Sequence, residues 1–167
     1  MSQSDATIAV FPGTFDPLTH GHLDIIRRGS RLFPKLVVGV GDNPEKQEIF
    51  SSDERAGMLR EQLTDLANVE VAAYSGLTME FVRSIGAKVL LRGIRDSVDL
   101  RSELQAANTN LMVGDLDTVF LMTSDQHALT SSTLIKQIVQ LGGYDSERLT
   151  RLVPREVLDK LRDKFPT

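Results

Sequence analysis

The chain has 167 residues, of which 41% are hydrophobic, so it can bury an independent core and has the composition of a globular protein. It contains no cysteine, which excludes disulfide bonds, a thiolate nucleophile and cysteine-bound metals, and which suits a reducing compartment. Its formal net charge of -4 argues against broad nucleic-acid binding, so any anion site must depend on a local concentration of positive charge.

The first half of the chain alternates between strand and helix patterns. Apolar runs rich in β-branched residues predict strands over 7–11, 35–40 and 69–73. An amphipathic pattern predicts a helix over 21–33, and a Ser-Ser-Asp-Glu capping box predicts a second helix over 51–66.

The second half continues this alternation. A short helix is expected over 78–85, a buried strand over 89–91 and a fifth strand over 118–122. A helix over 131–141 ends at two glycines, and a last helix follows Pro154. Between the last two strands, apolar residues recur at helical spacing, namely Leu100, Leu104, Ala107 and Leu111. The helix over 131–141 is expected to bury a stripe made of Leu134, Ile135, Ile138 and Val139.

Five strands separated by helices predict an α/β fold, a doubly wound five-stranded parallel sheet with helices on both faces and a C-terminal helix. Ligands of such sheets bind beyond the carboxyl ends of the strands. We interpret 1–167 as a single domain, with 1–6 as a polar N-terminal extension and 148–167 as a C-terminal helical tail. No apolar run approaches the roughly 20 residues of a membrane span, and 1–6 does not resemble a signal peptide, so we expect a cytoplasmic protein without membrane contacts.

The turn after the first strand carries the pattern Thr-x-Gly-His, from Thr19 to His22. A helix start offers unpaired N–H groups to an anion, so this junction predicts a phosphate site. The alternative is a plain tight turn, in which Gly13 supplies a positive φ and Thr19 or Asp16 caps the helix. His22 favours the phosphate site, because a histidine in the first helical turn can donate to a phosphate oxygen, whereas a capping turn has no use for it.

Three further strand ends carry suggestive chemistry, and a parallel sheet brings such ends together. They are 43–46, 92–95 and 130–133. Lys46 on an exposed loop is commonly just solvated, and serines before a helix commonly cap it. Arg92 follows a buried strand directly, so its charge needs an anion or solvent, and a bound phosphate would supply the anion. Together, the four ends predict a cationic, hydroxyl-rich crevice.

Several other chemistries lack their sequence patterns. Neither the P-loop pattern nor the glycine fingerprint of dinucleotide-binding folds occurs. The three histidines do not have metalloprotease spacing, so we expect no protein-ligated catalytic zinc. The Gly-x-Ser-x-Gly elbow is also missing, which disfavours a serine hydrolase.

The motifs occur in one order over residues 8–141, namely Pro12-Gly13-Thr14-Phe15-Asp16-Pro17 with Thr19-x-Gly21-His22, then Lys46, Arg92-Gly93-Ile94-Arg95, Glu103 and Ser131-Ser132-Thr133. In this order they resemble bacterial phosphopantetheine adenylyltransferases. The resemblance implies a Rossmann-like nucleotidyltransferase that makes dephospho-coenzyme A and pyrophosphate from ATP and 4'-phosphopantetheine, uses Mg²⁺ with ATP and assembles as a homohexamer. The chain departs from the usual family pattern at 100–102, 108–112 and 127–130.

The resemblance also implies roles for individual residues. The residues expected to act in catalysis are Thr14, His22, Lys46 and Arg95. Those expected to bind 4'-phosphopantetheine are Thr14, Lys46, Thr78 and Arg92. Those expected to bind ATP are Thr14, Phe15, His22, Gly93, Ile94, Arg95, Glu103, His127, Ala128, Leu129, Thr130, Ser131, Ser132 and Thr133. No residue is assigned to the metal, because the family's Mg²⁺ is held mainly by phosphates and water, in keeping with the chemistry of this ion.

Two other functions remain open from the sequence. A sister nucleotidyltransferase acting on another small phosphate, such as a mononucleotide or an alcohol phosphate, would use the same motifs. A non-catalytic nucleotide-binding module of similar architecture would bind ATP without turnover. A receiver-type signalling domain is disfavoured, because it needs clustered acidic residues where Pro12-Gly13-Thr14 stands.

Overall fold

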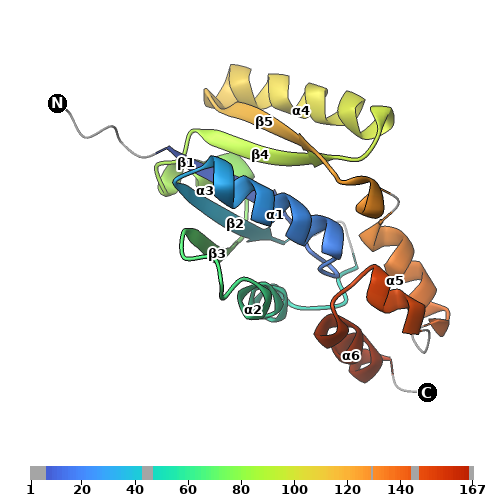
Figure 1. Ribbon diagram of the computed structural model, residues 1–167. Helices are drawn as coiled ribbons and strands as arrows, with labels where there is room; N and C mark the ends of the chain where they lie inside the picture. Colours follow the sequence, from blue (N-terminus) through green and yellow to red (C-terminus); the bar gives the residue numbers. More distant parts are fainter. Residues whose placement is uncertain (1–6, 43–46, 129, 144–146, 166–167) are drawn as a thin grey trace.

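The centre of the protein is a five-stranded parallel sheet with the strand order β3-β2-β1-β4-β5 (Figure 1). The computed structural model describes residues 7–42, 47–128, 130–143 and 147–165. The strands are β1 (Ile8–Gly13), β2 (Lys35–Gly41), β3 (Val69–Tyr74), β4 (Val89–Ile94) and β5 (Asp117–Met122). The predicted doubly wound parallel sheet is therefore confirmed, with strands one to three residues longer at their ends than the apolar runs alone indicated.

Helices alternate with these strands along the chain. They are α1 (His20–Leu32), α2 (Ser52–Gln62), α3 (Thr78–Ser84), α4 (Ser97–Gly114), α5 (Ser132–Gln140) and α6 (Arg155–Lys164), with 3₁₀ turns η1 (Asp125–His127) and η3 (Glu147–Arg151). The expectation that the second helix reaches residue 66 was wrong. Leu63 leaves the helical conformation, at φ -119° and ψ 15°, and its side chain is buried in the core.

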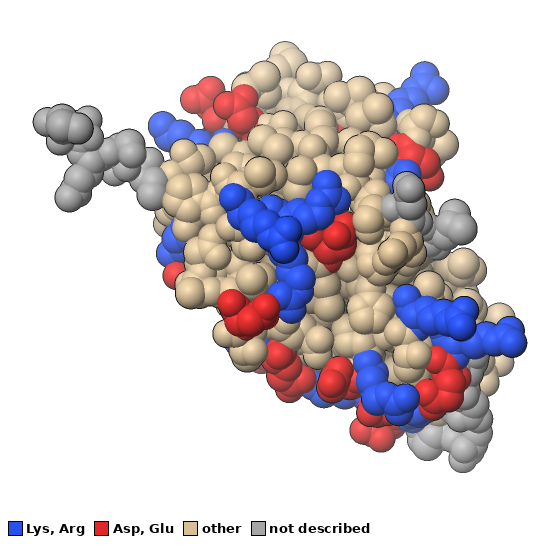
Figure 2. All heavy atoms as spheres, in the orientation of Figure 1, with Lys and Arg blue, Asp and Glu red and all other residues tan. Residues whose placement is uncertain are grey.

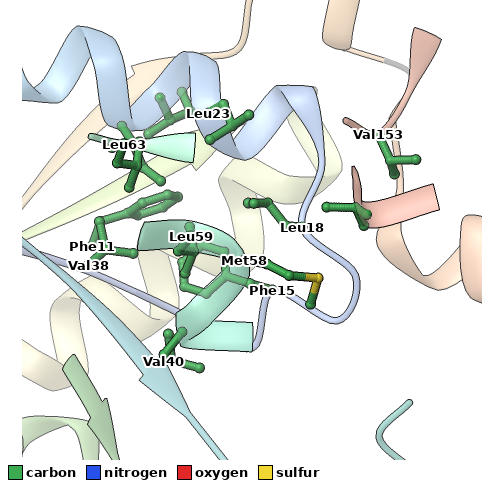
Figure 3. Packing of buried hydrophobic residues seen from close by; sticks show 14 of the residues in the cluster. Phe11, Phe15, Leu18, Leu23, Val38, Val40, Met58, Leu59, Leu63 and Val153 are labelled. Carbon is green, nitrogen blue, oxygen red and sulfur yellow. The ribbon is translucent and has the colours of Figure 1, made fainter. Parts of the chain in front are cut away.

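Side chains alternate between the two faces of the sheet, as period-two strands require. Ala9 and Phe11 of β1 pack in one cluster with α1, α2, α5 and α6, whereas Val10 packs in another cluster with α3. The first and larger cluster surrounds Phe15 and Leu59 (Figure 3). Each fully buried large apolar side chain contributes roughly 1.5–3 kcal/mol. The helices over both faces therefore fix the strand ends from which the site is built.

The C-terminal segment is part of this core. Leu149 of η3 and Leu158 of α6 are buried in the larger cluster, and the Leu152 carbonyl accepts a hydrogen bond from the His20 N–H at the start of α1, at 2.9 Å. The expected C-terminal helix is therefore confirmed. It supports the helix that carries the Thr-x-Gly-His pattern.

Two helical stripes differ from expectation in their burial. In α5, Ile135 and Val139 are buried but Leu134 is 52% exposed, because the core covers a narrower face of this helix than a four-residue stripe. The helix over the repeat at 100–111 is confirmed as α4, yet its leucines are 37–49% exposed. This helix lies along β4 and β5 (Figure 1). Much of its apolar surface is exposed. Among the described helices, none combines the length and the apolar character that crossing a bilayer requires.

Candidate functional site

Two cavities meet at the carboxyl ends of β1 and β4. The first, of about 330 Å³, is lined by the turn after β1, the start of α1, His127 and the segment 130–133. The second, of about 460 Å³, is lined by the ends of β1 and β2, by Tyr74 and Thr78, and by α4. The residues that line both cavities are Pro12, Gly13, Thr14, Arg92 and Glu103. The predicted strand-end crevice is thus divided into two chambers that share one junction.

The turn after β1 is built around Phe15. Phe15, and not Gly13, adopts the positive φ, at 51°, so the alternative of a plain tight turn with a positive φ at Gly13 was wrong in this respect. Gly13 is needed for a different reason, since a Cβ there would lie 2.9 Å from Cζ of the Phe15 ring. A non-glycine residue in the left-handed region costs on the order of 1–3 kcal/mol, and burial of the Phe15 ring against Phe11 and His22 offsets this cost. The turn therefore holds Thr14 at the junction of the two cavities.

His22 takes part in a capping box at the start of α1. Its backbone N–H donates to Oγ1 of Thr19 at 3.3 Å, and its Nδ1 accepts from the Thr19 N–H at 3.2 Å. The sequence argument that a capping turn has no use for this histidine was wrong. Because Nδ1 accepts a hydrogen bond, the proton of the neutral ring is placed on Nε2. The cap thus fixes the tautomer of an imidazole that lines the first cavity.

Burial is the main cause that lowers the pKa of His22 to about 4, and the positive charges of Arg95 and Arg92 add to this effect. The imidazole is therefore neutral at physiological pH. Together with the cap, this makes Nε2–H a neutral hydrogen-bond donor, and it argues against His22 as an ionic partner for phosphate.

Arg92 lies at the junction and already has a carboxylate partner. Its Nη2 and Nε donate to the two oxygens of Glu103 at 2.6 and 2.8 Å, and its Nη1 donates to the Pro12 carbonyl at 2.9 Å. The sequence argument left the anion to a bound phosphate. It named Glu103 as an ATP-binding residue but did not foresee that Glu103 pairs with Arg92. The bidentate pair fixes the plane of the guanidinium.

Arg95 is likewise held by a carboxylate of α4, that of Asp99, which lies one helical turn before Glu103. Its guanidinium forms an ion pair with Asp99 at 2.7 Å, which holds the pKa of the Asp99 carboxyl below its usual range, and its Nη1 donates to the Thr130 carbonyl at 3.1 Å. Asp99 and Glu103 are four residues apart and so share one face of the helix. The charges of both arginines are thus matched by α4, and the described part of the crevice is less cationic than expected. On the outer surface, basic side chains over α1 likewise lie beside acidic ones (Figure 2).

The segment 130–133 closes the first cavity from the side of α5. Ser131 caps α5 by accepting from the Leu134 N–H at 3.4 Å, so the capping interpretation holds for this serine. Ser132 Oγ donates to the Pro17 carbonyl at 3.0 Å and ties the segment to the turn after β1. His127 also lines the cavity, and its ring stacks on His20 with centroids 6.0 Å apart.

The structure brings most of the predicted site residues together. Those that line the first cavity are Thr14, Phe15, His22, Arg92, Gly93, Arg95, Glu103, His127, Thr130, Ser131, Ser132 and Thr133. Thr14, Thr78 and Arg92 line the second. Ile94 is 3% exposed, and neither it nor Ala128 is among the lining residues. Lys46 and Leu129 fall outside the described residues. Most of the described residues that were predicted to bind ATP thus line the first cavity. The described residues that were predicted to bind 4'-phosphopantetheine line the second.

The sequence analysis missed several residues at the site. Asp99 lines the first cavity, and Tyr74 lines the second, where its hydroxyl lies 2.8 Å from Oγ1 of Thr78. The largest omission is Arg55 of α2, which is fully buried and donates to the Thr14 carbonyl at 2.7 Å. No signal in the sequence indicates this burial, because the helix is polar on average and an arginine in its first turns is ordinarily exposed.

Within the described residues, no group of three or more histidines and carboxylates could hold a metal ion. The crevice instead offers main-chain groups, hydroxyls, arginines and the neutral imidazole of His22. Such a donor set suits phosphate oxygens.

Comparisons with known proteins agree with this geometry. A family model described as cytidylyltransferase-like matches residues 10–138. A "phosphopantetheine adenylyltransferase" of Synechococcus sp. (strain JA-2-3B'a(2-13)) is 46% identical over 160 residues, which cover 95% of this chain and 98% of that protein. A protein of the same name from Leuconostoc citreum (strain KM20) is 41% identical over 159 residues, which cover 95% and 99%.

Among solved structures, a bifunctional NMN adenylyltransferase/ADP ribose pyrophosphatase of Francisella tularensis, complexed with AMP and a Mn ion, has a similar fold. The TM-score is 0.65 at 19% identity, and the match covers 95% of this chain and 49% of that chain. At this identity the likeness concerns the fold alone.

Proposed function

The chain belongs to the phosphopantetheine adenylyltransferases, and we propose that its two cavities hold the two substrates of that reaction. It is a nucleotidyltransferase that passes the adenylyl group of ATP to 4'-phosphopantetheine, which gives dephospho-coenzyme A and pyrophosphate in coenzyme A biosynthesis. In our proposal, ATP occupies the first cavity and 4'-phosphopantetheine occupies the second. The observation that carries it is the shared junction, where Thr14 and Arg92 line both cavities.

The proposed chemistry needs no nucleophile from the enzyme. A phosphate oxygen of 4'-phosphopantetheine attacks the α-phosphorus of ATP in line, and the bond from this phosphorus to the pyrophosphate oxygen breaks. Thr14 orients the attacking phosphate at the junction, and Nε2–H of His22 donates to an α-phosphate oxygen as its charge grows. Arg95 neutralises charge on the ATP phosphates, and by resemblance Lys46 assists it. Arg92 holds the phosphate of 4'-phosphopantetheine, with Glu103 fixing its orientation.

We propose that Mg²⁺ accompanies ATP, and this ion would neutralise phosphate charge when bound. No protein cage is needed for it, which fits the donor set of the described crevice. We further propose a cytoplasmic location, where ATP is available, and a single catalytic domain, because α6 packs in the same core cluster as β1 and α1.

We also propose that the chain assembles as a homohexamer and that α4 supplies contacts between copies. The helix exposes Val98, Leu104, Leu111, Met112 and Val113, with Met112 at 87%. Apolar surface of this kind on one helix is typical of a protein interface. Because Asp99 and Glu103 lie on the same helix, packing of a second copy would also steady the carboxylates that hold Arg95 and Arg92.

The test is a product assay with a panel of acceptors. Purified protein is incubated with ATP and Mg²⁺, and with 4'-phosphopantetheine, nicotinamide mononucleotide, glycerol 3-phosphate or no acceptor, and pyrophosphate release is followed together with product mass. We expect release that depends on 4'-phosphopantetheine and a product with the mass of dephospho-coenzyme A. Preference for another acceptor would indicate a sister enzyme, and ATP binding without turnover would indicate a non-catalytic module.

A further inference from the structure

Arg55 is a charged residue with no exposed surface, and it contacts three separate segments around the site. Its Nη1 donates to the carbonyls of Thr14 at 2.7 Å and Gly41 at 3.0 Å. Its Nη2 donates to the carboxylates of Asp42 at 2.9 Å and Glu48 at 2.8 Å. Its Nε donates to two further carbonyls, those of Phe50 at 3.0 Å and Ser51 at 3.3 Å. One guanidinium thus joins the turn after β1, the end of β2 and the segment before α2.

A purely packing role does not explain an arginine at this place. Removing a guanidinium from water is costly, and a long apolar side chain would fill the same space in the core without that cost. What the guanidinium adds is a fixed fork of donors, which holds several carbonyls in set directions. The carbonyl with the shortest of these hydrogen bonds belongs to Thr14, the residue at the junction of the two cavities.

The contact with Thr14 also sets the direction of the next amide. In a trans peptide group, the C=O and the N–H point in opposite directions. Because the Thr14 carbonyl points to Arg55, the Phe15 N–H points away from Arg55, and both residues line the first cavity. Phe15 also has a positive φ in this turn. Successive N–H groups in turns with a left-handed residue form concavities that bind anions.

We propose that Arg55 is a positioning residue of the adenylyl transfer: through the Thr14 carbonyl, it turns the Phe15 N–H toward the phosphate oxygens of a nucleotide in the first cavity. This inference deepens the proposed function and rests on it. Arg55 itself touches no substrate. It acts by fixing a main-chain donor that would otherwise be free to rotate with its peptide group.

The first arm of the test uses the wild-type protein. The chain is labelled with ¹⁵N-phenylalanine, the Phe15 amide signal is assigned from its loss in a Phe15→Tyr variant, and ATP with Mg²⁺ is added. We expect the Phe15 amide proton to shift downfield, as a new hydrogen bond to phosphate requires. An amide that does not respond to ATP would overturn the proposal, whether or not any variant folds.

The second arm compares Arg55→Lys with Arg60→Lys, a control on the exposed side of the same helix. Lysine keeps the charge but not the fork, so kcat of Arg55→Lys should fall about 100-fold, the usual loss for one oxyanion donor. KM for 4'-phosphopantetheine should change little, and the downfield shift of Phe15 with ATP should disappear. The control should match the wild type in all three respects.

A folded Arg55→Lys variant with wild-type kcat would contradict the proposal, as would a fall in kcat with an unchanged Phe15 response. Circular dichroism melting separates these outcomes from simple unfolding, and if the variant does not fold, the wild-type arm decides. If the wild type makes no dephospho-coenzyme A, the proposed function itself fails, and the Phe15 response to ATP is still read independently.

Discussion

At the scale of single residues, the site is built from polar side chains that already form a hydrogen bond or an ion pair within the protein. Nδ1 of His22 accepts from the cap, which leaves Nε2–H for the cavity. Arg92 and Arg95 are each held by a carboxylate of α4, so their guanidinium planes are set before a substrate arrives. Such pre-organisation would suit the proposed transfer without an enzyme nucleophile, in which alignment and electrostatics would supply the rate.

His22→Gln separates the two roles of this histidine. Glutamine is a usual third residue of a capping box and can still accept from the Thr19 N–H, but it lacks the imidazole donor. We expect kcat to fall at least about 100-fold with little change in melting temperature. His22→Ala should lose kcat as well as roughly 0.5–1.5 kcal/mol of stability, the usual net contribution of the one side-chain hydrogen bond that it removes from the capping box. Near-normal turnover of His22→Gln, measured as pyrophosphate release, would contradict the role of the ring.

The lowered pKa of His22 also predicts how stability varies with pH. Between pH 6.5 and 4 the unfolded state binds a proton that the folded state does not, so stability falls as pH drops through this window. From pH 7 to pH 5 the loss is on the order of 2 kcal/mol, which is roughly 4–8 °C in melting temperature for a chain of this size.

Thermal melts of the wild type and His22→Gln at pH 7 and pH 5 measure this contribution as a difference. Between pH 7 and pH 5, the melting temperature of the wild type should fall by roughly 4–8 °C more than that of the variant. Parallel melting curves for the two proteins would mean that His22 titrates normally in the folded state.

At the scale of elements, the order and type of the helices and strands could be predicted from the sequence, because periodicity of two or 3.6 records local burial. The position of the crevice at the carboxyl ends of the strands could also be predicted, because parallel strands bring these ends together. The partners of the arginines could not be predicted, because the rotation of α4 over the sheet decides that Glu103 meets Arg92. The positive φ could not be placed on Phe15 either, since it depends on how closely the ring approaches Gly13.

Two glycines give a matched test of this close approach. Gly13→Ala places a Cβ 2.9 Å from the Phe15 ring, so we expect a loss of about 1–3 kcal/mol and reduced kcat as Thr14 shifts. Gly57→Ala, inside α2, meets nothing within 4 Å and should gain about 0.5–1 kcal/mol with unchanged kcat. Melting temperature and turnover are measured for both. A Gly13→Ala variant as stable and active as the wild type would show that the turn tolerates the added carbon.

At the scale of the whole molecule, the sheet, the C-terminal segment and α4 all act on the same crevice. The C-terminal segment holds the start of α1 through the Leu152 carbonyl, and α4 holds both arginines. Assembly through the outer face of α4 would therefore affect the site without contributing a residue to it. The exposure of this face could not be predicted from the sequence, because helical spacing identifies an apolar stripe but not what covers it.

Met112→Glu tests the assembly. A carboxylate in the middle of an apolar interface is costly, so this variant should lose mass in light scattering relative to the wild type and should turn over more slowly. Leu32→Glu, at the exposed end of α1, is the control and should keep the wild-type mass. If both variants and the wild type have the mass of a single chain, α4 is not an interface between copies.

The central claim is that each of the two cavities holds one substrate. A crystal structure with 4'-phosphopantetheine and a non-hydrolysable ATP analogue tests this claim most directly. The account predicts the nucleotide in the first cavity, the pantetheine arm in the second, and the α-phosphate within hydrogen-bond distance of His22 Nε2, with Thr14 at the attacking phosphate. Both ligands in one cavity, or an α-phosphate away from His22, would contradict it.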